Sequence, residues 1–186
     1  MLGIKWQRRL ALMVLASVGS AAYSKPIQYT NDEFNFRATV PAGYKVCTAL
    51  SGDHPHGFYY NVTTSVPCSR SLPKSEVSTI SIYASYNVLG DSLVGSAPRG
   101  CRKFRLNGLA TQSDGLFARN AYPCIVNNSD GSVDINVVKQ SLTGGETKGD
   151  AEGINYIASL HSYPRVLNRD LVKFVAFLNA VKVNRR

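Results

Sequence analysis

The sequence predicts an α+β fold: a mainly antiparallel β-sheet with one amphipathic C-terminal helix packed on it. Most of the chain alternates apolar and polar residues with a period of two, which is typical of antiparallel strands with one solvent-exposed face. One segment near the end instead spaces its apolar residues as a helix does. Four cysteines follow a leader-like N-terminus, which favours a domain held together by disulfides.

The strands are predicted from alternation along the chain. In the first, Phe34, Phe36, Ala38 and Val40 share one face, and "PAGY" then makes a turn. The predicted strand segments are 33–40, 44–50, 57–64, 77–86, 101–108, 116–124, 132–142 and 153–162. "SRSLPKSE" and "TGGETKGDAEG" are predicted to be loops.

The helix is predicted over Asn168–Ala180. Asn168 is a candidate N-cap and Asp170 lies in the first turn, where a carboxylate is favourable. Apolar residues at helical spacing predict the face that packs on the sheet: Leu171, Phe174, Leu178 and Val181.

The first 24 residues resemble a secretory signal peptide, with a charged "MLGIKWQRR", an apolar Leu10–Val18 and a small-residue exit after Ala22 or Ser24. The apolar run is shorter than the roughly 20 residues that cross a bilayer. Cleavage after Ser24 leaves one domain, 25–186, with 186 − 24 = 162 residues and a formal charge of +9 − 3 = +6. We therefore expect a periplasmic or secreted protein, without a membrane anchor after cleavage, and a bias toward anionic partners.

The cysteines are predicted to pair as Cys47–Cys68 and Cys101–Cys124, because neighbouring strands of a meander bring sequence neighbours together. Four cysteines allow three connectivities. Each bridge would stabilise the fold by roughly 3 kcal/mol. The chain has no Cys-x-x-Cys, so a zinc site made of cysteines is not expected, and no cofactor is predicted.

The segment "FNFRATVPAGYKV" resembles the opening of Mog1/PsbP-like domains, a group that includes DcrB-like exported proteins. The last strand and single C-terminal helix also fit that pattern. The resemblance covers these two ends of the chain. It implies an antiparallel α+β domain with an accessory or ligand-binding role, and it carries over no catalytic residue. The four cysteines and "HPHG" are not part of the pattern, and further helices that the family keeps on its sheet are not evident here.

Two motifs keep an enzymatic alternative open. "GDSL" at 90–93 matches the motif of the GDSL hydrolases, in which the serine, here Ser92, is the nucleophile; the Asp-x-x-His that supplies their base is absent. "SGDHPHG" offers His54 and His56, which could bind a metal together with His161. Pro55 and the flanking glycines favour instead a surface turn held by Cys47–Cys68, or a loop that contacts a partner. The alternative function is thus a metal-dependent or serine hydrolase.

A basic segment suggests a binding role. In "PRGCRKFRLNG" a strand would put Arg99, Lys103 and Arg105 on one face with Cys101, while Phe104 points inward. Such charges can simply keep an edge strand from pairing with another sheet. They can also form a patch for an acidic protein or an anionic envelope polymer. Nucleic acid is not expected as a partner, because the protein is predicted to be exported and its sequence does not indicate a basic groove rich in stacking aromatic residues.

Tyrosines near the "HPHG" segment, notably Tyr59 and Tyr60, could add a recognition surface, although tyrosine is also a good strand former. Since no nucleophile–base pair can be assembled from three histidines, the sequence favours a non-enzymatic function. We expect an exported binding or accessory protein, for example an inhibitor or immunity-type protein that acts on a protein partner or an anionic envelope component.

Overall fold

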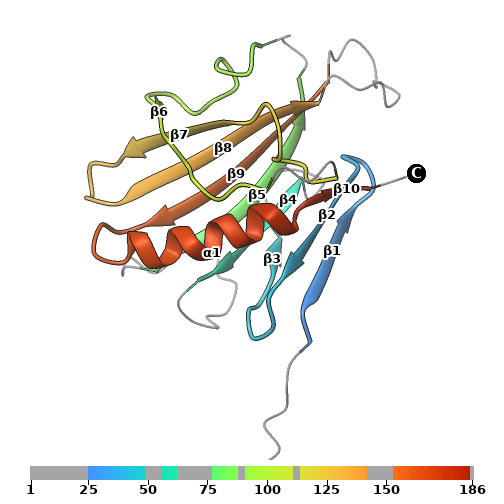
Figure 1. Ribbon diagram of the computed structural model, residues 1–186, viewed down its shortest axis with the longest axis horizontal. Helices are drawn as coiled ribbons and strands as arrows, with labels where there is room; N and C mark the ends of the chain where they lie inside the picture. Colours follow the sequence, from blue (N-terminus) through green and yellow to red (C-terminus); the bar gives the residue numbers. More distant parts are fainter. Residues whose placement is uncertain are drawn as a thin grey trace, which may run out of the picture.

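The computed structural model describes residues 25–48, 56–62, 77–87, 91–110, 114–141 and 153–184. Its single described helix, α1 (Leu167–Ala180), lies against strands that form two sheets (Figure 1). The strands are β1 (Ile27–Asn31), β2 (Phe36–Val40), β3 (Cys47–Thr48), β4 (Gly57–Asn61), β5 (Thr79–Tyr86), β6 (Arg102–Lys103), β7 (Tyr122–Asn127), β8 (Val133–Ser141), β9 (Ile154–Ser162) and β10 (Lys182–Val183).

All strand pairs are antiparallel. The larger sheet has seven strands in the order β3-β4-β5-β9-β8-β7-β6, and the smaller has three in the order β1-β2-β10. The last long strand, β9, is inserted between β5 and β8, so it closes the larger sheet at its centre. The predicted fold class, α+β with an antiparallel sheet and one C-terminal helix, is confirmed.

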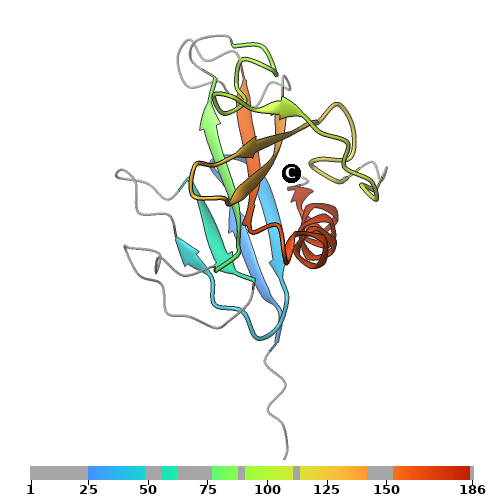
Figure 2. The ribbon, with the colours of Figure 1, turned by 90° about the vertical axis from the view of Figure 1, so that its left-hand side faces the viewer.

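The core lies between the inner faces of the sheets and α1. Phe36, Ala38 and Val40 point inward along β2 as the alternation predicted, and all three are fully buried. Phe34 is also fully buried, but it lies in the turn before β2, so the predicted strand 33–40 begins only at Phe36. From the helix, Phe177 packs edge-on against Phe58. Figure 2 shows α1 on one side of the strands, which leaves the other face of the larger sheet free of helix. We call that second face the outer face.

Several predicted elements differ in length. The predicted strand 116–124 is β7, beginning only at Tyr122, because residues 114–120 form turns that end with a positive φ at Asn120. The predicted strand 101–108 shrinks to the two residues of β6. The pairing of β1 and β10 with β2 was not predicted.

The helix begins one residue before the predicted start, and Asn168 is not its N-cap. Val166 occupies that position and makes no side-chain capping bond. Asp170, in the first turn, is fully buried and accepts hydrogen bonds from Ser162 Oγ at 2.9 Å and Arg169 Nε at 2.9 Å. The bond from Ser162 attaches the start of α1 to the end of β9.

The predicted Cys101–Cys124 disulfide is confirmed, with 5.4 Å between the two Cα atoms. Cys68 lies outside the described residues, so the Cys47–Cys68 pairing stays a prediction. The predicted signal peptide also lies outside them. No helix in the described part of the chain is long and apolar enough to cross a membrane.

Candidate functional site

One row of residues crosses the outer face from β4 to β6. The register places the members directly opposite one another, and directly opposite residues of an antiparallel pair project to the same face. The row consists of Tyr59, Ser81, Ser159, Asn136, Cys124 and Lys103. It is mostly polar, in contrast to the inner face, and it ends at a cation on the edge of the sheet.

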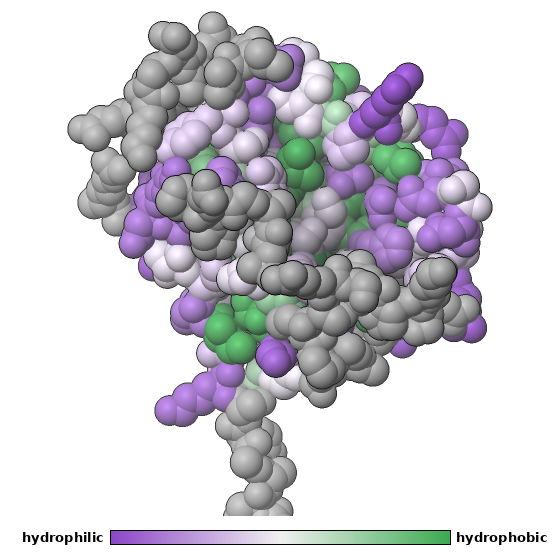
Figure 3. Space-filling view, turned by 180° about the vertical axis from the view of Figure 1, so that it is seen from behind, coloured by the Kyte–Doolittle hydropathy of each residue, from purple (hydrophilic) through white to green (hydrophobic). Residues whose placement is uncertain are grey.

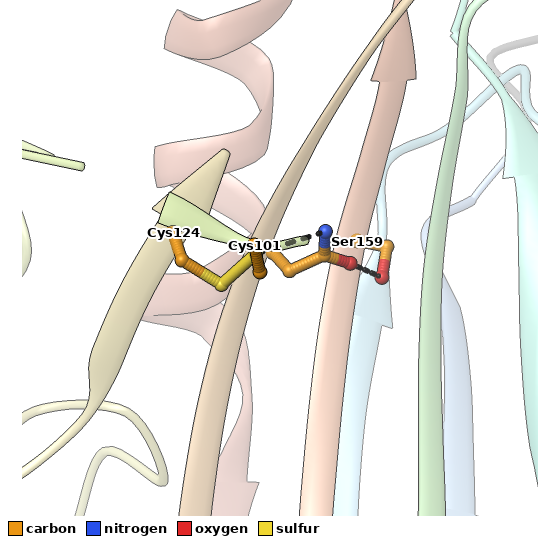
Figure 4. The surroundings of a disulfide bond; sticks show 4 residues. Cys101, Cys124 and Ser159 are labelled. Carbon is orange, nitrogen blue, oxygen red and sulfur yellow. Dashed lines mark hydrogen bonds between the residues drawn. A yellow bond between two sulfur atoms is a disulfide. The ribbon is translucent and has the colours of Figure 1, made fainter. Parts of the chain in front are cut away.

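Hydrogen bonds fix the centre of this row beside the disulfide (Figure 4). Ser159 Oγ donates to Asn136 Oδ1 at 2.6 Å, and Asn136 Nδ2 lies 3.8 Å from Cys101 Sγ as a weak donor. Asn136 is almost completely buried. The disulfide with Cys124 therefore anchors the segment that carries the cations to a rigid part of the sheet.

We call Arg99, Arg102, Lys103 and Arg105 the basic edge. All four residues are exposed, and β6 is the outermost strand of the larger sheet. In Figure 3, which shows the outer face, hydrophilic residues dominate the side where β6 and β7 lie. Within the described ranges, the side chains of the basic edge make no hydrogen bond or ion pair, so their charges face solvent.

The basic edge is not the long strand that was predicted. Arg99 lies in a turn closed by the bond from the Cys101 amide to Pro98 O, with Gly100 at a φ of 79°. The turn interrupts the strand alternation, so the prediction that Arg99 shares a strand face with Lys103 was wrong. Phe104 packs toward the core as predicted. Arg102 lies opposite Ile125, at the rim of the other face.

The structure separates the two tyrosines that were predicted to bind a partner. Tyr60 is only 2% exposed and packs against Tyr44 and Phe177, so it belongs to the core and not to a surface. Its burial raises the pKa of its hydroxyl far above the usual value, with a smaller contribution from Tyr44. Tyr59 lies on the outer face, half-buried. It is five strands from Lys103, roughly 24 Å at the usual spacing between strands.

The two described histidines, His56 and His161, do not converge. His54 lies outside the described residues. His56 Nδ1 is 3.1 Å from Ala84 O, and its ring stacks on Tyr83. His161 lies opposite Thr79, at the other end of β5, roughly 17 Å away along the strand. The described ranges hold no group of three metal-ligating side chains. His161 is therefore too far from His56 to share a metal with it, and a site that uses His54 stays an untested alternative.

His161 instead pairs with Asp134, with 2.7 Å between Nδ1 and Oδ1. Asn128 Nδ2 donates to the other carboxylate oxygen at 2.9 Å. The hydrogen bond to Asp134 raises the pKa of His161 above its usual value, against the opposite effect of burial. Burial alone would raise the pKa of Asp134, but the bonds from His161 and Asn128 outweigh it and lower that pKa. Sequence reasoning missed this pair, since only the β8–β9 register brings the two residues together.

Ser92 of the "GDSL" segment lies in a tight turn. Its Oγ accepts the Gly95 amide at 3.1 Å, and its carbonyl accepts the Ser96 amide. In the parts of the chain that the structure describes, no histidine hydrogen-bonds to Ser92. The predicted requirement for a base beside the nucleophile is therefore not met by the described residues.

No protein-family model matches the sequence, and no curated protein matches it. Seven chains of solved structures match. One is the solution structure of cyanobacterial PsbP (CyanoP) from Synechocystis sp. PCC 6803, with a TM-score of 0.45 and 10% sequence identity; the match covers 91% of this chain and 98% of that chain. PsbP is one of the proteins in the group that the sequence was found to resemble. The resemblance to Mog1 and to DcrB-like proteins stays a prediction.

Proposed function

We propose that the protein is an exported, non-enzymatic binding protein whose basic edge docks on an acidic surface of a protein partner. The observation that carries this proposal is the basic edge itself: four exposed cations, without partners in the described chain, on a segment fixed by a disulfide. The Cys101–Cys124 bridge holds the cations in place before binding, which reduces the entropy lost on association.

Charges at the rim of an interface act mainly on the rate of association and on its salt dependence. We therefore expect binding to weaken as ionic strength rises. Polar residues of the outer face, including Ser159, would supply hydrogen bonds to the same partner. Tyr59, roughly 24 Å from Lys103, would contact only a partner that spans the sheet. An inhibitor or immunity-type role would follow if the partner is an enzyme or toxin.

The test is a capture experiment from envelope extract with the wild-type protein and the double variant Arg99→Glu/Lys103→Glu. Arg37→Glu/Lys45→Glu is the matched control, because Arg37 on β2 and Lys45 are also exposed and the charge change is equal. We expect the wild type and the control to capture the same proteins, and the basic-edge variant to lose them. Equal capture by all three would contradict the proposal. Capture of an anionic polymer alone would identify the partner as an envelope polymer.

A further inference from the structure

A polar cavity of about 420 Å³ opens on the outer face, away from the basic edge. It lies where the end of β5 and the start of β9 meet the loop that follows β5. Its lining residues are Ser85, Tyr86, Asn87, Asp91, Gly95, Ser96, Asn155 and Ile157. The volume falls in the range of pockets that bind small molecules, which is roughly 300 to 1,000 Å³.

The walls of the cavity are built by hydrogen bonds that fix the described residues of the loop, Asn87 and 91–96. Asn87 holds Asp91 at both backbone groups: Oδ1 accepts the Asp91 amide at 3.0 Å, and Nδ2 donates to the Asp91 carbonyl at 3.1 Å. Gln140 on β8 donates to the same carbonyl at 2.6 Å and to Ser96 Oγ at 3.0 Å. The cavity is therefore preformed. These bonds use the side-chain NH₂ groups of Asn87 and Gln140 as donors.

The groups left over are mainly acceptors. Asn155 is 9% exposed, and its Oδ1 is buried without a hydrogen-bond partner. A buried acceptor without a partner is destabilising, and such a group in a cavity points to a donor that binds there. The Asp91 carboxylate makes no hydrogen bond or ion pair with the described residues. Ser85 adds a hydroxyl, and Ile157 adds an apolar wall.

We propose that this cavity binds a small molecule through a primary ammonium group. An ammonium has three donors and no acceptor, which matches a lining that offers an unpaired amide oxygen and a carboxylate. Its charge makes the hydrogen bond to Asp91 charge-assisted and therefore stronger than a neutral one. An anion would be repelled by Asp91, and a neutral polyol would leave the carboxylate charge uncompensated. The carbon skeleton of the ligand would lie against Ile157.

The experiment is a ¹⁵N NMR titration of the protein with cyclohexylammonium chloride, compared with cyclohexanol, which has the same ring without the charge, and with glucose as a polyol. We expect saturable shifts of the amides of Asp91, Gly95, Ser96 and Asn155 with cyclohexylammonium alone. Absence of these shifts, or equal affinity for cyclohexanol or glucose, would overturn the proposal.

Two variants make the assignment specific. Asp91→Asn keeps the shape but removes the charge, and it should weaken binding about tenfold or more. Asp130→Asn is the control, since Asp130 is an exposed carboxylate in the turn between β7 and β8. Asn155→Leu, which removes the unpaired oxygen, should also weaken binding while the fold is retained. Wild-type affinity in either cavity variant would refute the site. It shares no residue with the basic edge, so the two proposals fail independently.

Discussion

At the scale of single residues, the outer face joins two titratable groups whose pKa values move apart. His161 and Asp134 are each about two-thirds shielded from solvent, with exposed side-chain fractions of 28% and 33%. The hydrogen bond between them raises the pKa of His161 and lowers that of Asp134, although burial opposes both changes. Each shift favours the charged form, so the folded protein stabilises the ion pair rather than the neutral pair.

This linkage predicts how stability depends on pH. The raised pKa of His161 contributes stability that is fully present below its unfolded value, near 6.5, and is lost as pH rises through the folded pKa. The lowered pKa of Asp134 contributes stability above its unfolded value, near 3.8, that is lost as pH falls through the folded pKa. The pair should therefore stabilise most between about pH 4 and 6.5.

We expect His161→Gln to reduce the free energy of unfolding by about 1 kcal/mol at pH 5.5 and by less at pH 8.5, after allowance for solvent screening. Urea unfolding at the two pH values measures this, and an NMR titration gives the histidine pKa directly. His56→Gln is the control, because His56 lies within hydrogen-bonding distance of a backbone carbonyl and not of a carboxylate. An equal loss at both pH values would show that the pair does not act through charge.

The candidate site could be predicted only in part, and the reason lies in register. The alternation of polar and apolar residues within one segment predicted both the exposure of Lys103 and the inward packing of Phe104. The contact of His161 with Asp134, and the row from Tyr59 to Lys103, depend on which strands are neighbours, which alternation within one strand does not encode.

At the scale of elements, α1 is attached to the sheet by a buried carboxylate in its first turn. Asp170 is fully buried and accepts hydrogen bonds from Ser162 and Arg169. Ser78 also hydrogen-bonds to Asp170, and the hydroxyl oxygens of Ser78 and Ser162 lie 3.2 Å apart. Burial alone would raise the pKa of Asp170, but the bonds from Ser78, Arg169 and Ser162 lower it. Asp170 thus joins the helix to β9 and to the residue before β5.

Asp170→Asn should reduce the free energy of unfolding by about 2 kcal/mol, because two hydroxyl donors lose a charged acceptor inside the protein. Arg169→Gln is the matched control: Arg169 is half exposed, so its ion pair with Asp170 should matter by less than about 1 kcal/mol. Chemical denaturation at pH 7 measures both. A loss in Arg169→Gln as large as in Asp170→Asn would show that the ion pair, and not the serine bonds, holds the helix.

Periodicity predicted the long elements, made the two-residue strands β3 and β6 too long, and missed β1 and β10. Nine-residue β8 and β9 and the fourteen-residue helix each carry enough alternating or helical positions to be recognised. Two-residue β10 has no pattern of its own and exists because Lys182 and Val183 reach Arg37 and Phe36 on β2. The segment 116–120 alternates like a strand, but it forms a turn. Its Leu116 amide donates a hydrogen bond to Val181 O after the helix and not to a neighbouring long strand.

At the scale of the whole molecule, the two sheets are joined by contacts between residues far apart in the sequence. Tyr156 on β9 donates its hydroxyl to Phe34 O at 2.7 Å, and its ring packs edge-on against Phe36 on β2. At the C-terminus, Lys182 Nζ lies 3.0 Å from Asp114 Oδ1. The division into two sheets could not be predicted, because it depends on these long-range contacts and not on any local break in the strand pattern.

The Tyr156 hydroxyl should therefore hold the small sheet against the large one. Burial raises its pKa to about 12, so it remains a donor throughout the physiological range. Tyr156→Phe removes only this donor and leaves Phe34 O buried without it, which should cost about 1–2 kcal/mol of unfolding free energy. Because a raised tyrosine pKa favours the protonated folded state, the wild type should also lose stability as pH rises above 10.

Hydrogen exchange distinguishes a joint between the sheets from a merely local contact. In Tyr156→Phe we expect faster exchange of the amides that pair β1 with β2, while those that pair β8 with β9 keep their protection, since the small sheet has fewer strands to hold it. Tyr122→Phe is the control, because the Tyr122 hydroxyl has no hydrogen bond among the described residues. If protection in both sheets fell equally in Tyr156→Phe, the two sheets would unfold as one cooperative unit, and the hydroxyl would stabilise the domain as a whole rather than the joint between its sheets.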